Sequence, residues 1–141
     1  MADVGLTHIA LPVTNLDTSI AFYQRYAGLR VAHRRADPTT NLGVVWLTDG
    51  RRPFVIVLIE GAVHVPLTAP SHLGIACATR AEVDRLAAQA KAEGCWRDGP
   101  TDWGPPVGYW AYLADPDGHA VELSYGQDVE VAVHKLAGAS G

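Results

Sequence analysis

The sequence predicts an α+β fold built from two copies of one βαβββ module. The first observation is a repeat, because residues 6–13 and residues 71–78 look like versions of the same strand, each with a histidine near its start. The second is that a helical stretch follows each copy and ends near a glycine, Gly28 or Gly94. The third is that three strand-like runs follow each helical stretch. Internal self-similarity of this kind determines the architecture, so the two halves should share one topology.

The repeat sets the expected domain boundaries. We expect a single domain over residues 1–126, with module one at 5–60 and module two at 71–126. The stretch 61–70 links the modules, and residues 127–141 are predicted to be a C-terminal tail or a short helix.

Both helices have local support in the sequence. Asn15 or Asp17 can cap the first helix, and Thr79 with Glu82 three residues later forms a capping box for the second. The two terminal glycines suit the left-handed backbone position that ends a helix. Apolar residues recur at helical spacing in both stretches, namely Leu16, Ile20, Tyr23 and Ala27, and then Val83, Leu86, Ala87 and Ala90.

The strands are predicted from apolar runs bounded by turn residues. Asp49-Gly50 and Asp117-Gly118 are turn signals between the last two strands of each half. Residues 97–107, rich in glycine and proline, are expected to form a mobile loop. The expected strands after the helices are 29–35, 42–48 and 53–59 in the first half, and 95–98, 108–114 and 119–125 in the second.

Composition excludes several classes of protein. The net charge is −4 and no basic cluster is present, which argues against a nucleic-acid partner. The longest apolar run, residues 54–59, is too short to span a membrane. The first residues lack a basic start followed by an apolar run, and Cys77 and Cys95 fit no metal-binding spacing. We therefore expect a cytoplasmic protein with two free thiols and no membrane partner.

Strand alternation points to a metal site. His8 shares its strand face with small residues, and so does His72 in the repeated strand. Glu122 points away from its two aliphatic neighbours, and a glutamate in that position is costly to bury without a partner. A single strand histidine is more often a hydrogen-bonded core residue than a ligand. Two repeat-equivalent histidines with an inward glutamate favour one divalent metal ion held by His8, His72 and Glu122.

The first half offers no obvious fourth ligand. Counting from the turn glycines, the position that matches Glu122 is Val57. Glu60 is the acidic residue nearby, but it has the wrong strand parity unless the strand bulges. The other histidines are interpreted as surface or loop residues: His33, His64, His119 and His134.

Three motifs resemble those of the vicinal oxygen chelate superfamily, which includes glyoxalase I, extradiol dioxygenases, fosfomycin-resistance enzymes and bleomycin-binding proteins. The resemblance covers residues 6–125 and is most specific at the turn that precedes Glu122. It implies a pair of half-barrels and the metal ligands His8, His72 and Glu122, with Fe, Mn, Ni or Zn as the ion. The motifs are Thr7-His8-Ile9-Ala10-Leu11 with Ile20-Ala-Phe-Tyr23, then Ser71-His72-Leu-Gly-Ile75, then Asp115-Pro-Asp-Gly-His-Ala-Val-Glu122-Leu.

The resemblance also bears on the reaction. Glyoxalase I enzymes carry a glutamate base where this chain has Val57, so glyoxalase activity would require Glu60 to substitute as the catalytic base. Two histidines and one carboxylate are the ligand set of non-haem Fe(II) oxygenases. Tyr112 stands where extradiol dioxygenases place a tyrosine, and either orients the substrate or simply lines the barrel. The histidine that those dioxygenases use as acid-base has no counterpart near Phe54, and His64 in the linker is a weak substitute.

A non-catalytic function is the alternative. Bleomycin-resistance proteins resemble this chain and sequester a planar antibiotic between aromatic side chains. Trp46, Trp103 and Trp110 could bind such a molecule or a substrate, although tryptophans in a small barrel are also core residues. We expect a metal-dependent enzyme acting on a small molecule with two adjacent oxygens, with oxygenase chemistry favoured over lyase chemistry. By the resemblance, the chain should pair as a homodimer.

Overall fold

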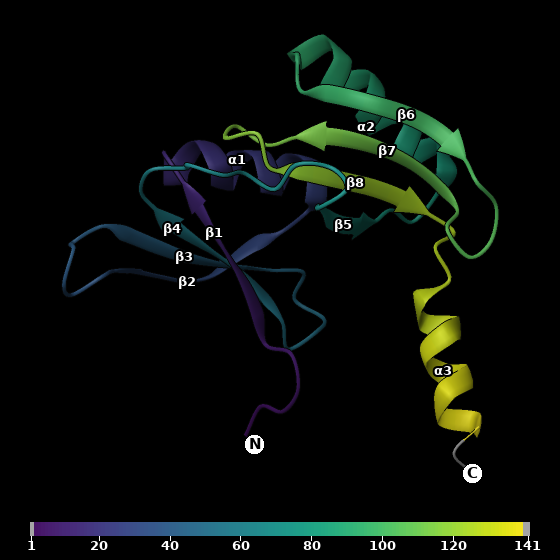
Figure 1. The fold of residues 1–141 in the computed structure, drawn as a ribbon, viewed down its shortest axis with the longest axis horizontal. Coiled ribbons are helices and arrows are strands. Elements are labelled where there is room, and N and C mark those ends of the chain that lie inside the picture. The colour runs from purple at the N-terminus through teal and green to yellow at the C-terminus, as the bar shows by residue number, and fades with distance from the viewer. Residues whose placement is uncertain (1, 140–141) are drawn as a thin grey trace. The chain divides into compact units, whose positions relative to one another are not determined.

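The computed structural model describes residues 2–139 and contains two four-stranded mixed sheets. Figure 1 shows each sheet with its labelled strands and helices. The described residues divide into two compact units. One contains the residues up to 68 together with Asp115–His119, and the other contains residues 69–114 together with those from 120 on.

The first sheet has the strand order β1-β4-β3-β2. β1 runs parallel to β4, and the other neighbours are antiparallel. The helix α1 connects β1 to β2 and lies against β3 and β4. The elements are β1 (His8–Val13), α1 (Leu16–Ala27), β2 (Arg30–Ala36), β3 (Gly43–Thr48) and β4 (Val55–Glu60).

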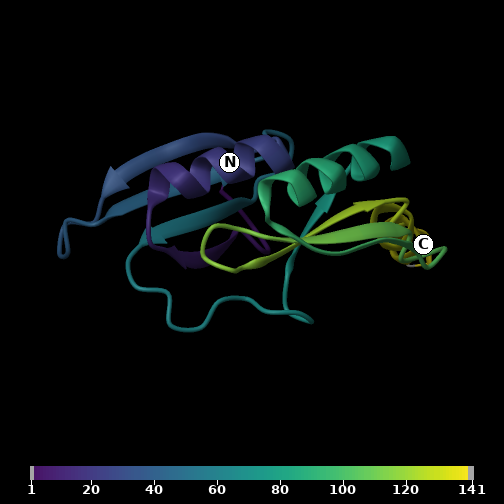
Figure 2. The same cartoon turned by 90° about the horizontal axis from the view of Figure 1, so that it is seen from above.

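The second sheet repeats this topology with the order β5-β8-β7-β6. β5 is parallel to β8, and α2 packs against β6, β7 and β8. Figure 2 shows α2 lying along one face of its own sheet. The elements are β5 (Leu73–Ala76), α2 (Arg80–Glu93), β6 (Trp96–Asp102), β7 (Tyr109–Ala114), β8 (Ala120–Tyr125) and α3 (Val129–Ala139). The predicted α+β repeat of βαβββ modules is therefore confirmed.

The predicted helix ends are also confirmed. The Asn15 side chain accepts a hydrogen bond from the backbone N–H of Thr18 at 2.9 Å, and Thr79 Oγ1 accepts one from Glu82 N–H at 3.1 Å. The Glu82 carboxylate, expected to complete a capping box, instead pairs with Arg85 at 2.7 Å. Gly28 and Gly94 close the two helices with φ of 62° and 80°.

One face of each sheet packs against its helix. On β4, Ile56 and Leu58 are buried, and they pair in register with the buried Leu47 and Val45 of β3. Val121 and Leu123 on β8 are fully buried in the same way in the second unit. Because side chains alternate along a strand, the intervening residues lie on the opposite face of each sheet.

The glycine- and proline-rich stretch after α2 differs from the expectation. Residues 97–102 belong to β6, and only the next few residues form a turn, so the prediction of a mobile loop over 97–107 is wrong for its first half. Thr101 pairs with Trp110, and the register shifts on either side of Asp98. Gly99 has φ of 78°, so the glycine serves a bulge within the strand rather than a loop.

The turn Asp115–His119 groups with the first unit and is held by polar contacts, those of Asp115 with Tyr23 and with the His119 N–H being buried. Asp115 Oδ1 accepts hydrogen bonds from the backbone N–H groups of Asp117 and His119, both at 2.9 Å, and Asp115 Oδ2 accepts one from Tyr23 Oη at 2.8 Å. The Asp117 carboxylate accepts from the Thr14 hydroxyl at 2.6 Å. Asp115 and Asp117, two residues of the motif that precedes Glu122, thus make the hydrogen bonds that hold the turn in place.

His119 corrects one of the sequence interpretations. The sequence pattern indicates a surface or loop residue, but only 1% of His119 is exposed. Its Nδ1 accepts a hydrogen bond from the Leu67 N–H at 3.0 Å, and its Nε2 lies 2.8 Å from the carbonyl oxygen of Pro12. Since that carbonyl can only accept, Nε2 carries the proton.

Two smaller expectations concern the thiols and membranes. Cys77 and Cys95 are free, as expected, and burial raises the pKa of the Cys77 thiol to about 11. Among the described residues, no helix combines the length and apolar character that crossing a bilayer requires.

Candidate metal and substrate site

His72 and Glu122 face each other in the second unit. Glu122 on β8 pairs in register with Gly74 on β5 and with Tyr112 on β7, so its side chain lies on the sheet face opposite α2. His72 immediately precedes β5. Its Nε2 lies 3.5 Å from Glu122 Oε2. This is close to the spacing of two ligand atoms on one metal ion, each of which lies about 2.0–2.2 Å from the ion.

The backbone fixes the orientation of the His72 ring. Nδ1 lies 2.7 Å from the carbonyl oxygen of Pro70, which can only accept, so Nδ1 carries the proton. Nε2 is then the ring atom directed at Glu122. A backbone carbonyl on the outer nitrogen is the arrangement found for metal-binding histidines, because it sets both tautomer and ring angle.

Glu122 is buried and has two polar neighbours besides His72. Only 6% of the residue is exposed, and Gln127 Nε2 donates a hydrogen bond to its Oε1 at 3.2 Å. The Tyr112 hydroxyl lies 3.1 Å from His72 Nδ1. Burial, and then the Glu122 carboxylate, raise the pKa of Tyr112, so the phenol keeps its proton. Sequence reasoning missed Gln127, because a glutamine just beyond a strand carries no signal that it will turn back toward the sheet.

His8 belongs to the first unit. It is exposed, and its Nδ1 lies 2.9 Å from Thr7 Oγ1, which leaves Nε2 available as it is in His72. Among the residues that the structure describes, no group of three or more histidine, cysteine, aspartate or glutamate side chains forms a metal-binding cluster. The structure brings together His72, Glu122 and Tyr112, all in one unit. Convergence of His8 with them stays a prediction.

The first sheet has the same positions with different side chains. Val57 on β4 pairs with Ala10 on β1 and with Trp46 on β3, so it is the counterpart of Glu122. The register thus supports the match made by counting from the turns. Trp46 in turn is the counterpart of Tyr112.

Glu60 lies on the other face of this sheet. By alternation it shares the helix-facing side of β4 with Leu58, and its Oε2 accepts a hydrogen bond from the Gly43 N–H at 3.2 Å. A Cβ added at Gly43 would meet the side chain of Leu16 on α1, which identifies that face. Glu60 therefore does not share a face with His8 or Val57, and the bulge that its catalytic role required is absent from the described pairing of β4 with β1.

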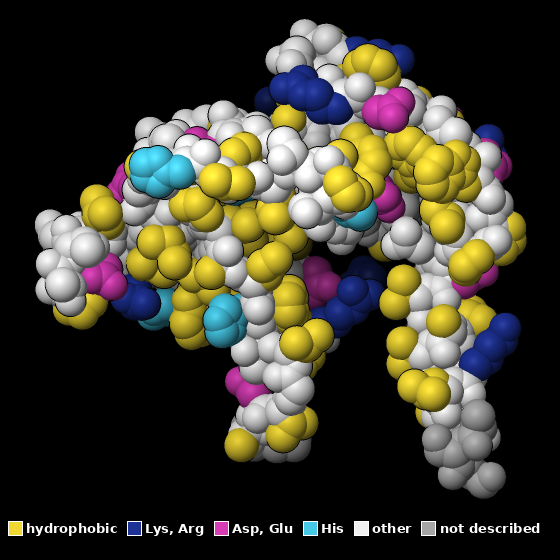
Figure 3. Space-filling view, in the orientation of Figure 1, with side chains coloured by type: hydrophobic (Ala, Val, Ile, Leu, Met, Phe, Trp, Pro, Cys, Tyr) yellow, Lys and Arg dark blue, Asp and Glu magenta, His cyan; other side chains and the backbone are white. Residues whose placement is uncertain are grey.

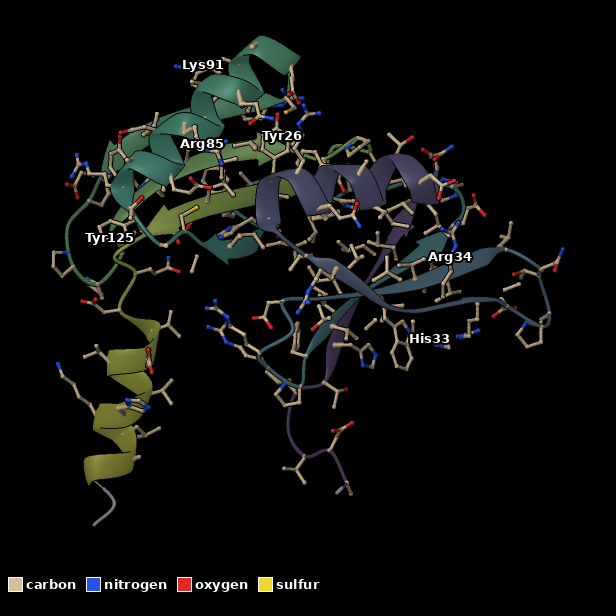
Figure 4. All side chains as sticks on the ribbon, turned by 180° about the vertical axis from the view of Figure 1, so that it is seen from behind. Tyr26, His33, Arg34, Arg85, Lys91 and Tyr125 are labelled. Carbon is tan, nitrogen blue, oxygen red and sulfur yellow. The ribbon has the colours of Figure 1, made fainter. Side chains whose placement is uncertain are left out.

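The aromatic residues expected to bind substrate divide between the units. In the first, Trp46 lies against His33 with ring centroids 4.9 Å apart. Figure 4 labels His33 and Arg34 on β2, and Arg34 pairs with Asp17 of α1 at 3.1 Å, so His33 occupies the face away from the helix. In the second unit, Trp103 contacts Trp110.

The fold and site define a class of protein with paired βαβββ modules, the second of which brings a histidine and a buried glutamate together. The chain belongs to the Glyoxalase/Bleomycin resistance protein/Dioxygenase superfamily, whose family model matches residues 5–123. A curated relative, the uncharacterized protein PA2024 of Pseudomonas aeruginosa, is 44% identical over 126 residues, covering 86% of this chain and 89% of the relative.

Solved structures give the same fold. The fosfomycin resistance protein FosX of Listeria monocytogenes, in a variant complexed with Mn(II) and 1S,2S-dihydroxypropylphosphonic acid, matches with a TM-score of 0.70 and 25% identity, over 94% of this chain and 99% of FosX. The trypanothione-dependent glyoxalase I of Leishmania major matches with a TM-score of 0.67 and 22% identity, over 99% of both chains, and shows the fold alone.

Proposed function

We propose that this chain is a divalent-metal-dependent enzyme that binds a small substrate through two adjacent oxygens. The observation that carries the proposal is the pair formed by His72 Nε2 and Glu122 Oε2, 3.5 Å apart, with the other ring nitrogen of His72 held by a backbone carbonyl. An imidazole nitrogen and a buried carboxylate oxygen directed at each other are a donor pair that a divalent cation can bind.

In this proposal the ligands are His72, Glu122 and His8, with His8 supplied by the first module of the same chain or of a second copy. The donor set of nitrogen and oxygen fits Fe, Mn, Ni or Zn. When bound, such an ion would act as a Lewis acid and as a template for the substrate oxygens. FosX, which carries Mn(II) and a ligand with neighbouring hydroxyls, supports this at the level of the superfamily.

Tyr112 is the residue of this chain best suited to direct the substrate. Its hydroxyl stands beside both His72 and Glu122, and a phenol is protonated at neutral pH and so can donate a hydrogen bond. We assign it the role of holding one substrate oxygen. Glu60 has no part in the proposed site, because it faces α1.

Oxygenase chemistry is favoured over lyase chemistry by Val57, the residue of the first module that is equivalent to Glu122. Val57 cannot move a proton as the glyoxalase base does, and it leaves the metal with one ligand fewer. Two histidines and one carboxylate leave open positions for a bidentate substrate and dioxygen.

The second candidate function is sequestration of a planar antibiotic without catalysis. It is supported by Trp103, a tryptophan that is 67% exposed at the turn before β7 and lies edge-on to Trp110. Tryptophan is enriched at binding interfaces relative to the rest of protein surfaces. In either case we propose a cytoplasmic homodimer, which sedimentation equilibrium can test.

Metal analysis separates the two functions. Protein purified without chelator should contain one divalent ion per chain, and His72→Ala, Glu122→Ala and His8→Ala should each remove it. Glu60→Gln is the matched control, since it changes a carboxylate on the opposite face and should keep the metal. Ligand binding that survives all three alanine variants, without turnover in any metal form, would establish sequestration instead.

The reaction class requires a second assay. Oxygen uptake is measured with a panel of catechols and compared with turnover of a hemithioacetal and with ring opening of fosfomycin. Uptake that depends on His72 and is reduced in Tyr112→Phe supports the oxygenase proposal. Hemithioacetal or fosfomycin turnover without oxygen uptake would overturn it in favour of the non-oxidative branch.

A further inference from the structure

A continuous row of rings crosses the second sheet on the face that carries Glu122. Trp110 pairs in register with Ser124, and Tyr112 pairs with Glu122, which places both aromatics on that face. The ring centroids of Trp103 and Trp110 are 5.2 Å apart, those of Trp110 and Tyr112 are 5.2 Å apart, and those of Tyr112 and His72 are 5.1 Å apart. The row therefore runs unbroken from an exposed turn to the proposed ligand His72.

Trp110 has a polar group that the fold leaves unpaired. The residue is 6% exposed, and its Nε1 has no hydrogen-bond partner among the described residues. Trp96 in the neighbouring strand differs, because its Nε1 donates to the carbonyl oxygen of Gly99 at 2.9 Å. Buried N–H groups are nearly always bonded, and an indole N–H can only donate. The missing partner of Trp110 is therefore an acceptor.

Trp103 contacts Trp110 from an exposed position. It lies 80° to the Trp110 ring, in an edge contact, yet 67% of it is exposed. Its backbone is fixed in a turn, with Trp103 N–H donating to Gly108 O at 3.0 Å and Gly108 N–H donating to Gly104 O at 2.7 Å. A rotation of the exposed Trp103 side chain would move its ring away from Trp110, and such rotations of exposed residues are fast.

We propose that Trp103 and Trp110 form a gated subsite for a planar ring that carries a carbonyl or carboxylate oxygen, with Trp110 Nε1–H donating to that oxygen and Trp103 stacking over the ring. Edge and face contacts among aromatic rings favour a flat ligand, and the unpaired donor selects one with an acceptor. The proposal deepens the proposed function, since the subsite adjoins Tyr112 and His72, where the substrate oxygens would bind. The subsite itself needs no metal.

The test is ¹⁵N–¹H NMR of the four tryptophan indoles in full-length, EDTA-treated protein. The probes are 2-naphthamide, which has a neutral carbonyl acceptor and chelates metals poorly, and 2-ethylnaphthalene, which has the ring without the acceptor. Each indole signal is assigned by the tryptophan-to-phenylalanine variant that removes it. We expect 2-naphthamide to move the Trp110 indole proton downfield, and 2-ethylnaphthalene to perturb Trp103 without that downfield shift. The Trp96 signal is the internal reference and should stay in place.

Two variants test the separate roles of the tryptophans. Trp110→Phe keeps an aromatic ring and removes the N–H donor. It should therefore lower the affinity for 2-naphthamide about tenfold and change the affinity for 2-ethylnaphthalene by less than about twofold. Trp103→Ala should weaken both probes. If Trp110→Phe does not fold, the change in the Trp110 indole signal of the unaltered protein on adding each probe still tests the subsite.

An equal response of Trp110 to both probes, or no response to either, would overturn the subsite. Because all these measurements are made without metal, a failure of the proposed metal chemistry leaves their outcome unchanged. An intact metal centre with an unresponsive Trp110 would reject the subsite alone.

Discussion

Glu122 and Val57 occupy equivalent positions in the two sheets. Glu122 pairs with Tyr112 on the neighbouring strand β7, and Val57 pairs with Trp46 on the neighbouring strand β3. The repeat has therefore kept its backbone register while placing a carboxylate and a phenol in the second sheet, and an aliphatic and an indole in the first. This asymmetry makes the second sheet the polar half of the proposed site. It also indicates which substitution would restore a symmetric ligand set.

Val57→Glu should supply a fourth ligand, which would be the second carboxylate of the site. We expect it to raise the affinity for Mn(II) or Zn(II) by at least about tenfold and to reduce oxygen uptake, because an open coordination position is lost. Isothermal titration and an oxygen electrode measure the two effects. Ile59→Glu, which adds the same charge two residues along the same face, is the control and should alter neither. An unchanged affinity in Val57→Glu would mean that the first sheet does not face the metal.

Gln127 should position Glu122 rather than bind metal itself. Gln127→Ala removes the hydrogen bond to Glu122 Oε1, and we expect metal affinity to fall about tenfold, since groups that orient a ligand typically contribute this much. The melting temperature should hardly change, because Gln127 is exposed. Gln89→Ala is the control: it removes a similar bond, to Glu93 at 3.1 Å on α2, and should leave metal binding intact. Equal losses in both variants would point to a general effect on folding.

The sequence predicted well wherever local chemistry determines structure. Asn15 and Thr79 cap their helices because a side-chain acceptor beside free N–H groups is a local arrangement. Counting from the turn glycines matches Val57 to Glu122, and the strand register agrees with this count. The caps need only neighbours in the chain, and the count from the turn needs only the sequence repeat.

The failures involve contacts between distant segments. His119 is buried because Leu67 and Pro12, far away in the chain, offer its two nitrogens partners. Gly99 and Pro100 are typical of a loop, but they lie in a strand that pairs with β7, where they form a bulge. Gln127 turns back to Glu122 although nothing beside it in the sequence requires this. Such long-range contacts produce no periodic pattern in the sequence from which they could be predicted.

Burial of Tyr23 should make the protein sensitive to alkali. Burial, and then the charge of Asp115, raise the pKa of Tyr23 far above its usual value. Below about pH 10 the tyrosine is neutral in both states, and its contribution to stability is complete. As the pH rises further only the unfolded chain loses the proton, so the free energy of unfolding should fall by about 1.4 kcal/mol per pH unit.

Urea unfolding between pH 8 and pH 11.5 measures this slope. Tyr23→Phe should flatten it, while lowering stability at pH 8 by about 1–2 kcal/mol through loss of the bond to Asp115. Tyr125→Phe, at an exposed position, should leave the slope in place. If the free energy of unfolding of Tyr23→Phe falls just as steeply with pH, a group other than Tyr23 causes the slope.

His119→Leu should destabilise the protein by about 2–4 kcal/mol. The substitution fills similar space but leaves the Leu67 N–H and the Pro12 carbonyl without the partners they have now. Guanidinium unfolding followed by circular dichroism measures the loss. His64→Leu, an equal change at an exposed position, should alter stability by less than about 0.5 kcal/mol. Equal stability of the two variants would show that the bonds of His119 contribute nothing.

Gly99→Ala should be among the most damaging small substitutions in the second unit. Gly99 has φ of 78°, and a Cβ there would lie 2.6 Å from the carbonyl oxygen of Trp110, a backbone atom that cannot move without breaking the β6–β7 pairing. We expect a loss of about 2 kcal/mol or more, and lower occupancy of the metal site because β7 carries Tyr112. Gly138→Ala on α3 is the matched control. Its Cβ meets nothing within 4 Å, and alanine favours the helix, so that variant should be neutral or slightly more stable. If the two variants melt at the same temperature, the bulge at Gly99 does not require a residue without a side chain.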